Sequence, residues 1–301
     1  MPSPNEMPRI PVIDLSLFDI GGTWRDHTAA QVDRAASELG CFRVIGHGIE
    51  PAVVESMREA SRSFFSQPSS TRVLYFREEL PDDAEPVHPD ELQPRNVFPE
   101  LPGFRDAVLD YMTALCGLGH KLMASIGRGL RLGDNYFVDR YTGRPTTLFR
   151  ISRESGLADE RGLVGEIGLA GEIGLAGEMG ERPGVAQSAE GLLTLLHEDG
   201  DNTLQMKCGS RWIDVPYVPG SFVVSIGDVL QRLTSGYYVS AAHRMIHRSG
   251  HACIGLPFSF GPRVDAVLRP VVSPTSPVHV ADRTMIRLSC KTTRAEDGAY
   301  S

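Results

Sequence analysis

The sequence lacks a long apolar run, an excess of positive charge and any close pair of cysteines. No segment approaches the roughly 18 apolar residues that a membrane-spanning helix needs, so no membrane segment is expected. The 30 basic residues are outnumbered by 38 acidic ones, and the net charge of −8 argues against nucleic acid or an anionic membrane as the main partner. Five scattered cysteines without a CxxC pair favour a reduced, cytoplasmic setting, and no secretory signal is visible.

The pattern of apolar residues predicts helices in the first half of the chain and strands in the second. Helices are expected over 28–40, 52–65 and 101–132, and an irregular stretch over 66–100. From residue 146 the chain consists of short runs separated by Gly, Pro, Asp and Asn: TLFRIS, GLLTLL, NTLQMK, RWIDVP, SFVVSIGDVL, YVSAAHRMI and CIGLPFSF. This order predicts a sandwich or jelly roll with helices packed outside it.

A glycine-rich insert at about 155–184 interrupts the strands. Residues 162–179 contain three near-copies of six residues, GLVGEI, GLAGEI and GLAGEM. The run has no proline and is short, so a collagen helix is not expected. Long insertions in surface loops cost little stability, which favours a passive repeat expansion; a lid over a pocket is the alternative.

Several motifs, in order along the chain, carry a family resemblance. IPVIDLS, GCFRVIGHGI, FPELPGFRDAVLDYMTAL, GLLTLLHEDGDNTLQM, the run from RWIDVP to SAAHRMI, and GLPFSFGP together resemble the isopenicillin-N-synthase-like family of iron(II)/2-oxoglutarate dioxygenases. The resemblance implies an α+β protein with a mostly β core, a double-stranded β-helix (jelly roll) with N-terminal and flanking helices. We expect one domain over 1–301, with an N-terminal family region at 1–100, central helices at 101–145, the jelly roll at 146–262 and an extension at 263–301.

The chain departs from the family at the reaction centre. The resemblance implies a metal site of two histidines and one carboxylate, the first two in an HxD motif. Gln187 and Ala189 stand at the HxD positions, whereas His243 matches the distal histidine. The family's RxS motif, whose arginine would pair with the carboxylate of 2-oxoglutarate, corresponds to Cys253 and Gly255. These losses predict that iron and 2-oxoglutarate binding are both lost, with no cofactor and no metal.

Other residues are candidates for a changed site. Ser152 and Glu154 match the family's Asn-x-Tyr on the strand that begins TLFRIS. We expect His243, Glu154 and Gln187 as catalytic residues. Substrate contacts are expected from a second set: Arg150, Ser152, Ala189, Cys253 and Gly255.

For three further features we expect no functional role. His197, Glu198 and Asp199 follow the GLLTLL strand and are expected to form a solvated turn. Histidines at 243, 247 and 251 would share a helix face, but the surrounding sequence predicts a strand, so the spacing is expected to be accidental. Arg244 is expected to form a structural ion pair, with Asp228 as its candidate partner.

The leading functional hypothesis is a degenerate oxygenase scaffold that performs metal-independent, redox-neutral chemistry on a small, specialised-metabolite substrate. Cyclisation, isomerisation, elimination or a pericyclic step are the candidate reactions, with His243 as general acid or base. One alternative is a non-catalytic binding or partner subunit. Another is a true iron(II)/2-oxoglutarate oxygenase whose metal site is rebuilt with Glu154 or Glu190. The substrate and the oligomeric state cannot be predicted.

Overall fold

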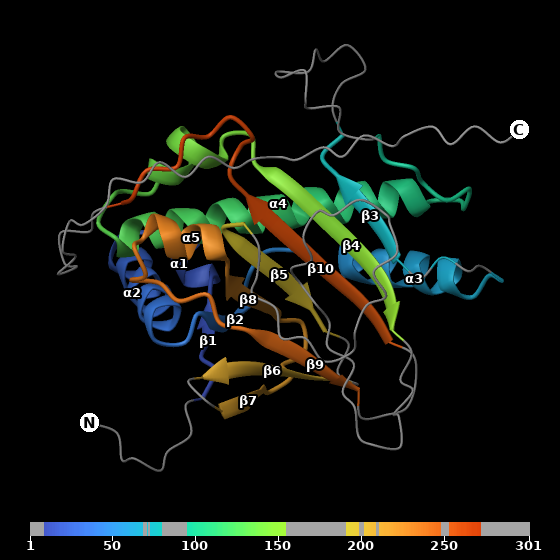
Figure 1. The fold of residues 1–301 in the computed structure, drawn as a ribbon, viewed down its shortest axis with the longest axis horizontal. Coiled ribbons are helices and arrows are strands. Elements are labelled where there is room, and N and C mark those ends of the chain that lie inside the picture. Colours follow the sequence, from blue (N-terminus) through green and yellow to red (C-terminus); the bar gives the residue numbers. More distant parts are fainter. Residues whose placement is uncertain are drawn as a thin grey trace, which may run out of the picture.

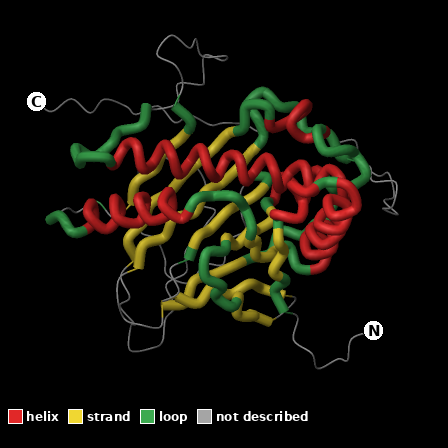
Figure 2. Tube along the Cα trace, turned by 180° about the vertical axis from the view of Figure 1, so that it is seen from behind, coloured by secondary structure: helices red, strands yellow, loops and turns green. Residues whose placement is uncertain are grey.

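The computed structural model describes residues 9–68, 71, 73–79, 95–154, 191–198, 202–208, 211–247 and 253–271. Within these ranges the chain forms two β-sheets and a set of helices (Figure 1). The large sheet has seven strands in the order β1-β2-β8-β5-β10-β4-β3, and the small sheet has three in the order β7-β6-β9. Figure 2 shows the long helices together on one face of the large sheet.

The helices and strands have the following bounds. The helical elements are α1 (Ser16–Ile20), α2 (Gly22–Glu38), α3 (Pro51–Phe65), α4 (Phe104–Gly129), a π-helical turn η1 (Val138–Thr142) and α5 (Asp228–Leu233). The strands of the large sheet are β1 (Val12–Asp14), β2 (Cys41–Ile45), β3 (Val73–Arg77), β4 (Thr146–Glu154), β5 (Leu193–His197), β8 (Phe222–Ile226) and β10 (Cys253–Gly261). The small sheet contains β6 (Asn202–Cys208), β7 (Arg211–Val215) and β9 (His243–His247).

Strand alternation gives the large sheet two different faces. On β4 the side chains of Phe149 and Ile151 are fully buried in the core that the helices complete, and the ring of Phe149 lies 5.1 Å from that of Tyr111 on α4. Successive side chains of a strand point to opposite faces, so Arg150 and Ser152 lie on the other, inner face. We call the helix-covered face the outer face and the face toward the small sheet the inner face.

A second core joins the inner face to the small sheet. It contains Cys41, Leu196 and Val223 from the large sheet, and Leu204, Met206, Ile213 and Val215 from the small one. Two sheets that pack face to face through alternating apolar residues define a jelly roll. The predicted double-stranded β-helix with flanking helices is therefore confirmed. In the described ranges no helix combines the length and apolar character that a membrane crossing requires.

Local predictions hold where periodicity is strong and fail at element ends. The helix predicted over 28–40 begins earlier, at Gly22, and the stretch 66–100 contains the strand β3. SFVVSIGDVL is not one strand: β8 ends at Ile226 and α5 begins at Asp228, because the chain turns at the end of the buried strand. The glycine-rich insert lies outside the described residues.

Helix α4 packs closely against β10 because Gly119 has no side chain. A Cβ atom at Gly119 would lie 2.6 Å from the ring of Phe260, whereas a Cβ at Gly117, on the same helix, would meet nothing within 4 Å. We expect Gly119→Ala to lower the free energy of unfolding by about 1–3 kcal/mol through overpacking. Gly117→Ala should raise it by up to about 1 kcal/mol through helix propensity. Urea unfolding of both variants tests this difference; equal effects would contradict it.

Candidate functional site

The inner face of β4 presents two polar side chains between the sheets. Ser152 is 3% exposed, and its hydroxyl has no hydrogen-bond partner among the described residues. Nη2 of Arg150 is also buried without such a partner. Buried polar groups are nearly always hydrogen-bonded in folded proteins, so these two groups are the ones that a bound molecule would satisfy.

His243 approaches the same region from the small sheet. It begins β9, paired with Met206 of β6, and is 1% exposed. Neither Nδ1 nor Nε2 has a hydrogen-bond partner within the described part of the chain. A buried imidazole with two unpartnered nitrogens is unusual, because even a neutral ring has one donor and one acceptor to satisfy.

Backbone packing holds the segment that leads to His243. Gly40, in the turn between α2 and β2, adopts a left-handed φ of +69°, and a Cβ there would lie 2.0 Å from the carbonyl oxygen of Val239. The amide of Val239 donates to the carbonyl of Ala36 at 3.1 Å. The close approach of this turn therefore fixes the chain shortly before β9 begins.

Electrostatics connects His243 to Arg150. The pKa of His243 is lowered from its ordinary value of 6.5 to about 4, mainly because the ring is buried, with a smaller contribution in the same direction from the positive charge of Arg150. The ring is therefore neutral at physiological pH. Neutral imidazole is the form that binds a metal ion.

The other predicted site residues are placed only in part. Gly255 of β10 pairs directly with Ser152 of β4, and Cys253 pairs with Glu154. The side chains of Cys253 and Glu154 lie outside the described residues, and so do Gln187 and Ala189. Among the side chains that are described, no group of three or more His, Cys, Asp or Glu could hold a metal ion.

The expectation of a solvated turn after β5 is wrong. Glu198 is only 5% exposed and forms an ion pair with Arg43 of β2, which is itself 1% exposed. Arg43 also donates to the Ser221 hydroxyl at 3.1 Å. The charge at 198 is buried because its partner comes from a strand 155 residues away, which local sequence does not show.

Two other expectations also need revision. Arg244 does not pair with Asp228: its Nε donates to Oε1 of Gln205 at 2.8 Å, and its guanidinium lies 4.2 Å from the ring centroid of Trp212. Asp228 instead pairs with Arg232 one turn along α5. The strand predicted around His243 is confirmed as β9. Sequence reasoning missed Thr194, whose buried hydroxyl on the inner face of β5 also lacks a partner in the described chain.

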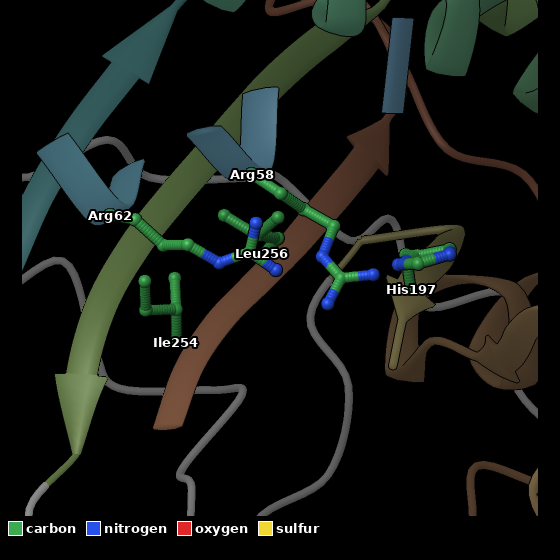
Figure 3. A pocket seen from close by; sticks show the side chains of 5 residues that line it. All are labelled: Arg58, Arg62, His197, Ile254 and Leu256. Carbon is green, nitrogen blue, oxygen red and sulfur yellow. The ribbon is translucent and has the colours of Figure 1, made fainter. Parts of the chain in front are cut away.

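A small pocket lies on the opposite, outer face of the large sheet. It is lined by Arg58, Arg62, His197, Ile254 and Leu256. Figure 3 shows the two arginines reaching from α3 across β10 toward His197. Because Leu256 belongs to the helix-side core, the sheet separates this pocket from Arg150 and His243.

His197 makes stability depend on pH. Its pKa is lowered from 6.5 to about 4, mainly because the ring is buried, with smaller contributions from the positive charge of Arg58 and from His47. In the unfolded chain His197 is protonated below about pH 6.5, whereas in the folded protein it is protonated only below about pH 4. The free energy of unfolding therefore decreases as the pH falls from about 6.5 to 4. We expect the melting temperature of His197→Gln to fall less between about pH 7 and 4.5 than that of the wild type. The exposed His27→Gln should follow the wild type; parallel curves for all three would contradict the prediction.

The fold and the inner face together define a class: a double-stranded β-helix protein with a polar centre between its two sheets. The model described as "non-haem dioxygenase in morphine synthesis N-terminal" matches residues 10–91, and that of the "2OG-Fe(II) oxygenase superfamily" matches 181–257, together more than half of the chain.

Curated proteins and solved structures agree with these models. The chain is 28% identical to a 1-aminocyclopropane-1-carboxylate oxidase of Dictyostelium discoideum, over 87% of this chain and 84% of that protein. It is 28% identical to a homoarginine-6-hydroxylase of Arabidopsis thaliana, covering 87% of each chain. A Neurospora crassa protein, solved in complex with alpha-KG and thymine, superposes with a TM-score of 0.74 at 18% identity over 92% of this chain and 93% of that one. The chain belongs to the isopenicillin-N-synthase-like 2-oxoglutarate/iron(II) oxygenase family.

These comparisons correct the prediction that iron and 2-oxoglutarate have been lost. The oxygenase model matches a segment that contains Gln187, Ala189, His243, Cys253 and Gly255, so the departures at single positions do not remove the chain from the family's pattern. The relatives are oxidases and hydroxylases, and the Neurospora structure contains alpha-KG. The comparisons therefore point to iron and 2-oxoglutarate as cofactors, and they do not support a metal-independent cyclase.

Proposed function

We propose that the chain is an iron(II)- and 2-oxoglutarate-dependent oxygenase that oxidises a small organic molecule, with His243 as one ligand of the metal. The observation that carries this proposal is His243 itself: a fully buried imidazole, neutral, with both ring nitrogens unpartnered among the described residues, on the inner face of a double-stranded β-helix. A metal ion would satisfy one of those nitrogens.

The described residues supply one part of the site for each group that the family implies. His243 offers the neutral imidazole that iron(II) prefers, and Arg150, on the inner face of β4, offers a positive charge that suits a carboxylate. When bound, iron(II) supplies the activation of oxygen. The protein residues supply a buried, water-poor setting, a fixed nitrogen on β9 and a positive charge on β4.

The remaining ligands have to differ from those of the family pattern. Positions 187 and 189 carry glutamine and alanine, which leaves Glu154 and Glu190 as the nearest carboxylates in sequence to the matched motifs. The names of the two curated relatives, 1-aminocyclopropane-1-carboxylate oxidase and homoarginine-6-hydroxylase, support a small organic substrate.

Anaerobic reconstitution tests the proposal. Purified protein is loaded with iron(II), 2-oxoglutarate is added, and the bound metal is counted by elemental analysis. We expect one iron per chain and a visible charge-transfer band that needs both iron(II) and 2-oxoglutarate. Loss of the band in Glu154→Gln or Glu190→Gln would identify the carboxylate ligand. Wild-type protein with no stoichiometric iron and no band would refute the proposal.

A further inference from the structure

Arg150 is a cation that the described part of the protein leaves without a counterion. Nη2 of its guanidinium is buried with no hydrogen-bond partner, and no ion pair joins it to any side chain that the structure describes. Arg150 as a whole is half-buried, but its Nη2 is closed off from water, and a buried donor without a partner costs about 1–3 kcal/mol. An anion bound there would satisfy this donor.

Ser152 adds a hydroxyl on the same face. Residues 150 and 152 are two apart on β4, about 7 Å along a strand, which is within the reach of an arginine side chain. The Ser152 hydroxyl is buried and unpartnered like the guanidinium, within the described chain. One planar cation and one hydroxyl on one strand face form a donor set that suits a carboxylate.

The location of Ser152 matches the place where the serine of the family motif is missing. Ser152 pairs directly across the sheet with Gly255, the position at which the resemblance would place the serine of RxS. Directly opposed residues of an antiparallel pair have Cβ atoms about 5 Å apart, so a hydroxyl on β4 reaches nearly the same space as one on β10. Because Gly255 has no side chain, it leaves that space open.

The neighbourhood of the pair is also consistent with a bound carboxylate. His243 begins β9 and pairs with Met206, a residue of the core between the two sheets, so its ring faces the inner side of the large sheet. A 2-oxo acid bound to a metal beside His243 would lie between the two sheets, on the side to which alternation directs Arg150 of β4.

We propose that Arg150 and Ser152 replace the RxS motif and hold the distal carboxylate of 2-oxoglutarate from the neighbouring strand. This inference rests on the proposed function, since the cosubstrate has to bind beside the metal. It differs from the family pattern in the strand that supplies the charge: β4 instead of β10.

A pair of ligands that differ only in the distal carboxylate tests the proposal. Iron(II)-loaded protein is titrated anaerobically with 2-oxoglutarate and with 2-oxovalerate, which has the same 2-oxo acid head and chain length but no distal carboxylate. Dissociation constants are read from the charge-transfer band and from calorimetry. In the wild type, 2-oxoglutarate should bind at least about 10-fold more tightly, because hydrogen bonds between charged groups are the strong ones.

Arg150→Gln should weaken 2-oxoglutarate at least about 10-fold and leave 2-oxovalerate nearly unchanged. The affinity of Arg150→Lys for 2-oxoglutarate should lie between that of the wild type and that of Arg150→Gln, because lysine keeps the charge but not the bidentate geometry. Ser152→Ala should weaken 2-oxoglutarate by a smaller factor. The matched control is Arg153→Gln, which removes an exposed cation further along β4, whose Nη1 donates to the carbonyl of Phe65 at 2.7 Å on the other face.

The outcomes separate this inference from the proposed function. Equal weakening of both ligands in Arg150→Gln, no weakening, or a wild type without preference for 2-oxoglutarate would overturn the inference while the oxygenase function stands. A wild type that binds iron but neither ligand, or no iron, would overturn the function and with it the inference. Thermal unfolding checks the fold: without ligand, Arg150→Gln should melt close to the wild type, because no hydrogen bond of the described chain is lost at Nη2.

Discussion

Replacing His243 by alanine is expected to reduce iron(II) affinity at least about 100-fold and to abolish oxidation of the substrate. The loss of a residue that merely orients a ligand typically costs about 10–100-fold in metal affinity, and the loss of a direct ligand costs more. His243 is the one described histidine that lies between the sheets with both nitrogens unpartnered. Elemental analysis of protein reconstituted anaerobically gives the iron content directly.

His120 offers a matched control. It is a partly buried histidine of α4 on the outer side of the large sheet, where its ring lies 5.2 Å from that of Phe260 and its Nδ1 is unpartnered within the described chain. His120→Ala removes the same chemical group and creates a similar defect, but it should leave one iron per chain. If His243→Ala keeps its iron, or if both variants lose it equally, His243 is not a ligand.

Replacing Arg43 by methionine is expected to destabilise the protein by about 3–5 kcal/mol, because the substitution leaves the Glu198 carboxylate buried without its arginine. Arg43 is 1% and Glu198 5% exposed, and Arg43 also donates to the Ser221 hydroxyl and, at 3.3 Å, to the Val215 carbonyl. The pair thus joins β2 to the chain after β5 and to the loop before β8. Urea unfolding measures the change.

A double-mutant cycle separates the buried charge from lost packing. Arg43→Met combined with Glu198→Leu should recover most of the loss, because neither charge then remains buried alone. The exposed pair Arg34–Glu38 on α2, with side chains 78% and 57% exposed, is the control. Arg34→Met should change stability by no more than about 0.5 kcal/mol. A small effect of Arg43→Met, or a double variant as unstable as the single one, would contradict the prediction.

The buried pair also illustrates a limit of sequence reasoning. Acidic residues after a strand are typical of solvated turns, and Glu198 fits that local pattern. Its burial depends on Arg43, which is contributed by β2 across the inner face. The same limit explains the missed strand β3 within 66–100: a five-residue strand forms there because β4 offers it an edge to pair with.

The cofactor prediction failed for a related reason. The chain departs from the family's metal motif at Gln187 and Ala189, and from its 2-oxoglutarate motif at Cys253 and Gly255. These departures imply that iron and 2-oxoglutarate binding are lost only if no residue at another position can take the same role. Ser152 pairs directly with Gly255, so a side chain on β4 and one on β10 reach nearly the same space. The place of a residue in the fold therefore predicts its role in cofactor binding better than its place in a sequence motif does.

Sequence patterns alone were enough to predict the class of fold and the long helices, because the 3.6-residue period of a helix and the 2-residue period of a strand are local properties. The two faces of β4, with Phe149 and Ile151 on one and Arg150 and Ser152 on the other, were assigned from burial in the structure. Which faces meet became clear only from the packing of the two sheets. The small sheet packs on the inner face of the large one, so His243 of β9 and Arg150 of β4 face the same side although they are far apart in the chain, and local sequence does not relate them.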